Sequence, residues 1–317
     1  MEQAEIVARP VVTKLNPALG AEITGIDLSL PLDPEQIREF RDALDTYGVL
    51  CFRDQKLSEQ QQIAFTEQWG SLEDFPEENK TVAASTVYNV ANVSAQGEHL
   101  PETDHRVIFQ KVNALWHTDS SYRYVPAYAS LLYGIEVMPD DAVGGRTGFS
   151  NMVLAYEALP DDLKTRIEPL HMVHSYEHGR RMFASLPPLS NFEKNAVPPV
   201  SHPLVRVHPD GRRSLFMTAN AGNEISGMPL EEGQALHRQL VEHVSRPEFC
   251  YFHKWKKGDL VVWDNRTTLH KAEVYDMGRY RRVFRRTTLA GDGPVLGPYS
   301  QVVLARTKSL AAKQEAR

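Results

Sequence analysis

Short segments with the composition of β-strands follow one another through most of this sequence. Three of them, GDLVVWDN (258–265), TTLHKAEV (267–274) and RRVFRRTTLAG (281–291), are separated only by tight turns, and YASLLYGIEV (128–137) precedes them. Their β-branched and aromatic residues favour strands. Many short strands with a few inserted helices indicate an antiparallel barrel or a jelly roll. We therefore expect a mainly β fold.

A few segments interrupt this pattern with helical spacing. Asp33 and Pro34 are favourable residues for the start of a helix, and apolar residues then recur every three or four positions up to Gly48. Further helices are expected over 58–70, over 151–158 with Ser150 as the cap, and over 229–244.

The remaining segments have little periodicity. Residues 71–113 contain one strand-like stretch and a polar run, and 184–201 contain four prolines, so we expect two long loops that can act as lids. Residues 202–218 are typical of a hairpin around PDGR. The polar residues 306–317 are expected to form a flexible tail.

The composition excludes several classes of partner. The 317 residues carry a formal net charge of −6, which gives the protein as a whole no affinity for nucleic acid or an anionic membrane. No apolar run approaches the roughly 18 residues of a membrane-spanning helix, and the first residues do not resemble a secretory signal. Cys51 and Cys250 lie in strand-like segments without a CxxC pattern. Free core thiols and a cytoplasmic location follow as expectations.

A candidate metal site begins in LWHTDSSY (115–122). His117 and Asp119 are two residues apart, so on an extended backbone they point to the same side. An isolated HxD pattern is more often structural, but His270 lies in a second strand-like segment and can complete a set of three ligands. Two histidines and one carboxylate with open positions are typical of non-haem Fe(II) oxygenases. Structural zinc prefers four ligands, often cysteines, and the sequence has no such cluster.

Two arginines after His270 can supply positive charge to this site. Arg281 and Arg285 are four residues apart, so in a strand they share a face, about 13 Å apart along the backbone. The alternative is a solvated cationic edge, with Arg282 and Arg286 on the other face. Thr147 in GGRTGF offers a hydroxyl, unless it is only a surface threonine. An unpaired buried guanidinium is costly, so this charge predicts an anionic substrate.

Taken together, four motifs resemble a known family. WHTDSSY (116–122), GGRTGF (144–149), GDLVVWDNRTTLH (258–270) and YDMGRYRRVFRRTT (275–288) occur in this order and with this spacing in the Fe(II)/2-oxoglutarate dioxygenases of the taurine/2,4-dichlorophenoxyacetate dioxygenase family. The likeness covers residues 19–291 and is closest to the aryloxyalkanoate branch. Any one of the motifs alone is not specific.

The resemblance implies a double-stranded β-helix core, jelly-roll or cupin-like, in a single catalytic domain over 1–317. It also implies Fe(II), 2-oxoglutarate and O₂ as the reactants beside the substrate, with ascorbate helpful in vitro. The residues it implies are His117, Asp119 and His270 for iron, Asn113, Thr147 and Arg281 for 2-oxoglutarate, and Arg285, Tyr88 and Lys80 for the substrate.

The implied reaction couples decarboxylation of 2-oxoglutarate to hydroxylation of a small anionic substrate, releasing succinate and CO₂. Where the hydroxylated carbon bears an aryl ether oxygen, as in 2,4-dichlorophenoxyacetate, the product collapses to a phenol and an oxo acid. The same chemistry on an alkyl sulfonate, an alkyl sulfate or another small carboxylate is an alternative. A zinc hydrolase or isomerase, or a non-catalytic binding barrel, would belong to another class. We expect a homo-oligomer.

Overall fold

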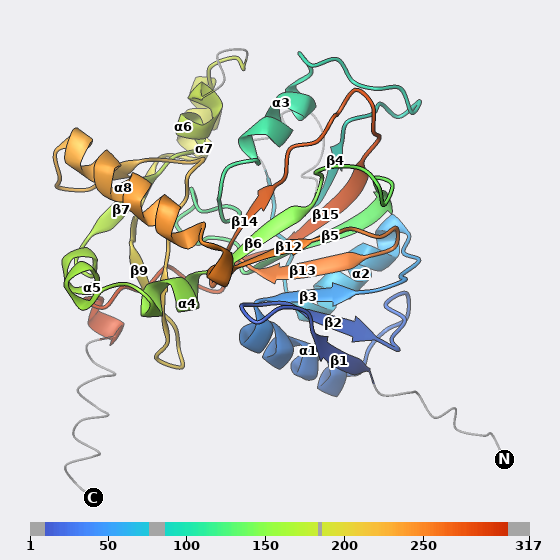
Figure 1. Ribbon diagram of the computed structural model, residues 1–317, viewed down its shortest axis with the longest axis horizontal. Helices are drawn as coiled ribbons and strands as arrows, with labels where there is room; N and C mark the ends of the chain where they lie inside the picture. Colours follow the sequence, from blue (N-terminus) through green and yellow to red (C-terminus); the bar gives the residue numbers. More distant parts are fainter. Residues whose placement is uncertain (1–9, 76–85, 183–185, 304–317) are drawn as a thin grey trace, which may run out of the picture.

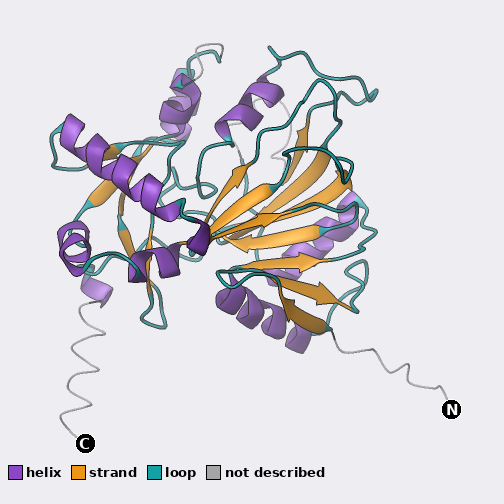
Figure 2. Cartoon of the chain, viewed as in Figure 1, coloured by secondary structure: helices purple, strands orange, loops and turns teal. Residues whose placement is uncertain are grey.

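The structure of the protein is a computed structural model, which describes residues 10–75, 86–182 and 186–303. One large sheet and three smaller groups of strands form its framework, with helices packed around them (Figures 1 and 2). The expectation of a mainly β fold with inserted helices is confirmed. In order across the large sheet, the strands are β1 (Val11–Lys14), β2 (Ala21–Thr24), β3 (Val49–Phe52), β13 (Leu260–Asp264), β5 (Ala129–Glu136), β15 (Val283–Leu289) and β4 (Val87–Ala91).

Within the large sheet β2 and β3 are parallel and the other neighbours are antiparallel, whereas the smaller groups are antiparallel throughout. One sheet has the order β12 (Cys250–His253), β6 (Thr147–Asn151) and β14 (Thr268–Ala272), and another has β11 (Glu224–Ile225), β7 (His171–His174) and β8 (Val200–Pro203). Strands β9 (Val205–Val207) and β10 (Arg213–Leu215) form a separate pair. This pair is the hairpin expected around PDGR.

The helices are α1 (Pro34–Tyr47), α2 (Glu59–Trp69), α3 (His105–Val112), α4 (Met152–Glu157), α5 (Asp161–Ile167), α6 (Tyr176–Arg181), α7 (Asn191–Ala196) and α8 (Leu230–Val244), with a 3₁₀ turn at Pro247–Phe249. The start of α1 is fixed as expected, because Asp33 and Gln36 form a reciprocal capping box. Within the described residues, no helix is both long and apolar enough to cross a membrane.

Three local expectations are wrong. Helix α4 is capped by Asn151, whose side chain accepts from two backbone N–H groups, because the Ser150 hydroxyl is buried and donates to Val244 O instead. Helix α3 lies inside the segment 71–113, where Val107, Ile108 and Val112 carry a short apolar stripe among polar residues. Helix α7 lies inside 184–201, where Ser190 and Glu193 form a capping box. The expected tail over 306–317 lies outside the described residues.

The large sheet has a different partner on each face. On one face it packs against α1 and α2 through residues such as Phe40 and Phe65 (Figure 1). On the other face Phe149 of β6 packs against Trp263 of β13, with ring centroids 5.7 Å apart, and joins the same buried cluster as Phe284 of β15. Both cysteines are buried and free, which confirms that expectation. The space between the two sheets is where the candidate ligands meet.

Candidate active site

His117 and His270 form a cross-strand pair. Each donates its backbone N–H to the carbonyl of the other, at N···O distances of 2.9 and 2.7 Å, and their ring centroids are 4.1 Å apart. Asp119 lies on the same side, with Oδ2 3.7 Å from Nε2 of His270. One ligand atom from each of the three residues lies within 4.8 Å of the others, and all three side chains are buried. The structure therefore brings the three expected metal ligands together.

The protonation states fit a metal. Burial lowers the pKa of His117 below 6.5 and that of His270 well below it, so both imidazoles are neutral at pH 7. His117 Nδ1 lies 2.7 Å from Leu115 O, which holds its proton there and leaves Nε2 as the lone-pair atom. A transition metal binds histidine through such a neutral nitrogen.

Both oxygens of the Asp119 carboxylate accept hydrogen bonds. Ser130 Oγ donates to Oδ2 at 2.6 Å, and Arg286 Nη1 donates to Oδ1 at 3.0 Å. Burial raises the pKa of Asp119, but the guanidinium of Arg286, the two histidines and the hydrogen bond from Ser130 together outweigh it, so the pKa lies well below its usual range. The group is a carboxylate at neutral pH, as a metal ligand must be.

Asn265 connects the loop of the ligands to the sheet. Its side-chain oxygen accepts from Trp263 Nε1 at 3.0 Å and from the backbone N–H of Asp119 at 3.2 Å, while its Nδ2 donates to Ser130 Oγ at 3.0 Å. Asn265 therefore positions both Asp119 and the hydroxyl that bonds it. Sequence reasoning missed Asn265 and Ser130, although Asn265 lies inside the quoted WDN motif.

Strand β15 presents two different sets of side chains. Arg285 points to α2, where its Nε donates to Gln62 Oε1 at 2.9 Å and its Nη2 to Leu57 O at 2.9 Å. Arg281 precedes the strand and is 43% exposed in an ion pair with Glu136 at 2.8 Å. Neither contacts the ligand cluster, so the structure does not bring Arg281 and Arg285 together with the expected metal ligands. Side chains alternate along a strand, and a shift of one reverses the face.

Arg286 contacts the ligand cluster instead, and Arg282 is the buried residue just before β15. Arg282 lies over the ring of Phe284, 4.1 Å from its centroid, and is 5% exposed. Within the described residues no carboxylate pairs with its guanidinium, and burial lowers its pKa to about 10. A buried cation without an anionic partner is costly, which makes Arg282 a candidate for binding an anion.

Thr147 lies close to this group. Its Oγ1 accepts from Trp255 Nε1 at 2.9 Å, and Trp255 packs edge-on against Phe284 at 4.6 Å between centroids. Trp255, Phe284 and Arg282 line one cavity of about 340 Å³. Thr147 is therefore grouped with Arg282 rather than with Arg281.

A pocket is lined by two of the three candidate ligands, His117 and Asp119. It contains Asn113, whose carbonyl accepts from Ala272 N at 2.7 Å, and Tyr88 of β4. Expected contact residue Lys80 lies outside the described residues. The lining combines five aromatic residues with mostly polar ones and consists of Phe75, Tyr88, Phe109, Val112, Asn113, His117, Thr118, Asp119, Ser120, Ser121, Tyr122, Tyr176, Gly179, Arg180, Asn220 and Arg286.

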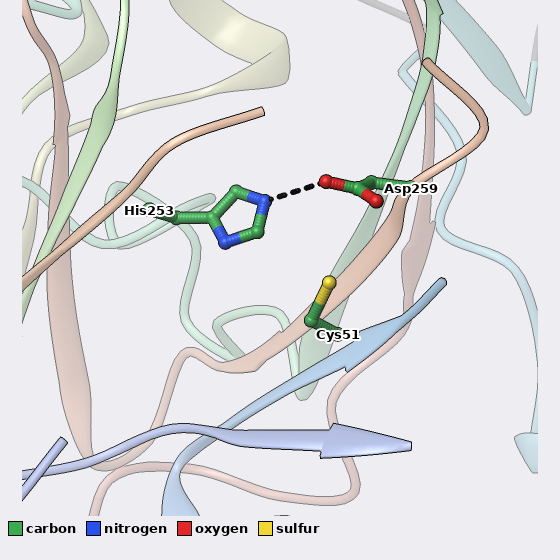
Figure 3. A group of neighbouring side chains, drawn as sticks. All are labelled: Cys51, His253 and Asp259. Carbon is green, nitrogen blue, oxygen red and sulfur yellow. Dashed lines mark hydrogen bonds and ion pairs between the residues drawn. The ribbon is translucent and has the colours of Figure 1, made fainter. Parts of the chain in front are cut away.

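Cys51, His253 and Asp259 form a second buried group of metal-ligand types (Figure 3). His253 Nε2 lies 3.0 Å from Asp259 Oδ2, and its Nδ1 lies 2.9 Å from Tyr251 OH. Arg53 Nη1 also donates to Asp259 at 2.7 Å. Both ring nitrogens are thus occupied and the carboxylate is already neutralised, while burial raises the pKa of Cys51 and keeps it a thiol. We interpret this group as a structural network.

Comparisons with known proteins agree with this geometry. The model of the taurine catabolism dioxygenase TauD, TfdA family matches residues 12–288. The chain is 38% identical over 289 residues to an alpha-ketoglutarate-dependent 2,4-dichlorophenoxyacetate dioxygenase of Cupriavidus pinatubonensis, covering 90% of this chain and 98% of that protein. It is 35% identical to an (S)-phenoxypropionate/alpha-ketoglutarate-dioxygenase of Sphingobium herbicidovorans, covering 93% and 98%.

A solved structure resembles the whole fold. The crystal structure of AAD-2 in complex with Mn(II) and N-oxalylglycine superposes with a TM-score of 0.81 at 37% identity, covering 91% of this chain and 99% of that one. The resemblance drawn from the four motifs is confirmed. The chain belongs to the taurine catabolism dioxygenase TauD, TfdA family.

Proposed function

We propose that the protein is an Fe(II)- and 2-oxoglutarate-dependent dioxygenase that hydroxylates aryloxyalkanoates at the carbon bearing the ether oxygen. The observation that carries this proposal is the buried group of His117, Asp119 and His270 beside a pocket with aromatic walls. Relatives that act on 2,4-dichlorophenoxyacetate and phenoxypropionate, at 38% and 35% identity, support the same substrate class.

His117, Asp119 and His270 would hold the iron. The residues fit, because two neutral imidazoles and one carboxylate are the ligand set of non-haem Fe(II) oxygenases. Bound there, the metal supplies the activation of O₂ that couples decarboxylation of 2-oxoglutarate to hydroxylation of the substrate. The hydrogen bonds from Ser130 and Arg286 fix the orientation of Asp119, and Leu115 O fixes the ring of His117.

Arg282 would bind the distal carboxylate of 2-oxoglutarate, with Thr147 beside it. This role of Arg282 is supported by the burial of its guanidinium, which lacks a carboxylate partner among the described residues. AAD-2 was solved with N-oxalylglycine, a dianion that has an NH where 2-oxoglutarate has a CH₂. Asn113, at the C-terminal end of α3, would line the route between this cosubstrate and the pocket.

The aromatic walls would hold the substrate ring and exclude water from the reacting carbon. Hydroxylation inserts one oxygen atom of O₂ into the C–H bond beside the ether oxygen, while the other oxygen enters succinate. The hydroxylated product is a hemiacetal, which loses a phenol and leaves an oxo acid. The protein's own part is to place this C–H bond toward the metal.

The proposal also includes the expectations about the fold, the single domain, the cellular location and the oligomeric state. The seven-stranded sheet and the sheet β12-β6-β14 would be the two layers of a double-stranded β-helix, in one catalytic domain over 1–317. A cytoplasmic homo-oligomer remains our prediction, as does the benefit of ascorbate in vitro.

A substrate screen tests the proposal. Purified protein with Fe(II), 2-oxoglutarate and O₂ is offered 2,4-dichlorophenoxyacetate, both enantiomers of 2-phenoxypropionate, an alkyl sulfate and an alkyl sulfonate, and succinate is measured against a no-substrate control. We expect substrate-dependent succinate and an equal amount of phenol with an aryloxyalkanoate. Succinate with the sulfate or sulfonate alone would overturn the substrate class, and none with any compound would overturn the function.

A further inference from the structure

A buried glutamate contacts the turn that follows Asp119. Glu73 comes after α2 in the sequence and is 6% exposed, and its backbone N–H donates to Thr288 O of β15 at 2.8 Å. Its carboxylate accepts from Ser120 Oγ at 2.8 Å and pairs with Arg123 Nε at 2.9 Å. Both partners come directly after the candidate ligand in the sequence. One side chain therefore joins this turn to the large sheet.

Ser120 has a backbone conformation that favours glycine. Its φ is 54°, in the left-handed region, where a residue with a side chain is strained. Because Ser120 is the next residue after Asp119, this conformation sets the direction in which the chain leaves the candidate ligand. A strained backbone persists only where the surrounding contacts hold it. The contacts here are the hydrogen bond from the Ser120 hydroxyl to Glu73 and one from Arg123 N to Ser120 O at 2.9 Å.

The contacts of Asp119 itself act on the other side of this turn. Ser130 and Arg286 donate to its carboxylate oxygens, and Asn265 accepts from its backbone N–H. These bonds hold the side chain and the peptide that precedes the ligand. Glu73 instead bonds the residue that follows it, and a hydrogen bond to a buried carboxylate is among the strong ones in a protein.

We propose that Glu73 is a positioning residue that holds Ser120 in its left-handed conformation and so favours the backbone in which Asp119 meets the two histidines. The inference rests on the proposed function, since Asp119 is a ligand of the proposed iron site. When the contact with Glu73 is lost, Ser120 relaxes toward an ordinary φ, and metal binding must first restore the turn. The apparent affinity for the metal then falls with the fraction of molecules that keep the competent turn, while the coordination of the bound metal stays the same.

Anaerobic titration with Co(II) tests this role. Burial raises the pKa of Glu73 to about 7, so the titration is run at pH 8, where the side chain is a carboxylate. E73Q keeps the size of the side chain but loses its charge. We expect its dissociation constant for Co(II) to rise roughly tenfold, the loss of one hydrogen bond to a charged group. The visible bands of Co(II) at saturation should keep their positions.

D74N is the matched control for E73Q. It makes the same change of charge one residue away, but Asp74 is exposed and contacts Arg123 through its backbone carbonyl rather than its carboxylate. The dissociation constant of D74N for Co(II) should equal that of the unaltered protein.

Two substitutions at Ser120 separate the backbone from the hydroxyl. Glycine adopts a positive φ without strain, whereas alanine keeps the strain and both lack the hydroxyl. We therefore expect S120G to bind Co(II) more tightly than S120A, by roughly tenfold, the cost of a left-handed residue that has a side chain. Because Glu73 acts through the Ser120 hydroxyl, E73Q should raise the dissociation constant less in the S120A protein than in the unaltered one.

Urea unfolding distinguishes positioning from a merely structural role. A metal-free E73Q protein that is less stable but binds Co(II) as the unaltered protein does would overturn the role of Glu73. If E73Q does not fold, the two Ser120 variants decide, and equal affinities of S120G and S120A would overturn the role. Absence of Co(II) binding by the unaltered protein would instead overturn the proposed function, and this role with it.

Discussion

Arg286 Nη1 donates to Asp119 Oδ1 at 3.0 Å, and this contact joins strand β15 to the loop of the candidate ligands. Ser130 Oγ occupies the other carboxylate oxygen at 2.6 Å. Side chains from two strands of the large sheet therefore orient the carboxylate. The same contact shows which face of β15 is directed toward the site.

Replacing Arg286 should weaken metal binding. In R286Q the Asp119 carboxylate loses both a hydrogen bond and a compensating charge, so we expect the affinity for Co(II), measured by anaerobic titration, to fall by roughly 10- to 100-fold. R285Q, on the opposite face, is the control and should bind Co(II) as the unaltered protein does. Equal affinities for R286Q and R285Q would contradict this assignment.

The register of β15 has its own test. R282Q should raise the KM for 2-oxoglutarate by roughly 10- to 100-fold, because a buried guanidinium loses its carboxylate. R281Q removes only an exposed ion pair with Glu136 and should leave this KM unchanged. The reverse pattern, with R281Q impaired and R282Q normal, would instead assign the binding of 2-oxoglutarate to Arg281.

The buried network of Cys51, His253 and Asp259 (Figure 3) is expected to stabilise the folded protein. In D259N the buried carboxylate that pairs with Arg53 and His253 is lost, and we expect the free energy of unfolding in urea to fall by about 3 kcal/mol. E136Q, at an exposed pair, should change it by less than about 1 kcal/mol. Stabilisation of the unaltered protein by Zn²⁺ that disappears in C51A would instead make the group a metal site.

His208 makes stability depend on pH. Burial lowers its pKa to about 4 in the folded protein, against 6.5 in the unfolded chain. Between these values the unfolded state binds the extra proton, so stability falls as the pH falls from 7 to 5, by roughly 2 kcal/mol for this group. Urea unfolding at both pH values should show that H208Q loses less stability than the unaltered protein by about this amount. Equal losses would show that His208 is protonated in the fold.

The sequence predicts the parts of this molecule that local chemistry specifies. The capping box of Asp33 and Gln36 can be predicted because it needs only neighbouring residues. His117, Asp119 and His270 can be predicted as metal ligands because this combination of residue types and spacing is unusual. The sequence does not predict which face of β15 is directed to the site, because the paired arginines of RYRRVFRR offer the same residue type on both faces.

Other features depend on tertiary contacts that no local pattern contains. The roles of Asn265 and Ser130 appear only when β13, β5 and the loop of Asp119 meet. Arg180 lies on a helix of six residues whose position follows from the contact between Gly179 and Asn220. Sequence spacing alone does not relate such residues to the metal ligands.

The central claim is that His117, Asp119 and His270 bind ferrous iron so that 2-oxoglutarate can join it. The most direct measurement is an anaerobic titration of the protein and 2-oxoglutarate with Fe(II), followed by visible absorption. We predict a weak charge-transfer band that saturates at about one iron per chain and is absent in H270A. A band of equal intensity in H270A, or none in the unaltered protein, would contradict the account.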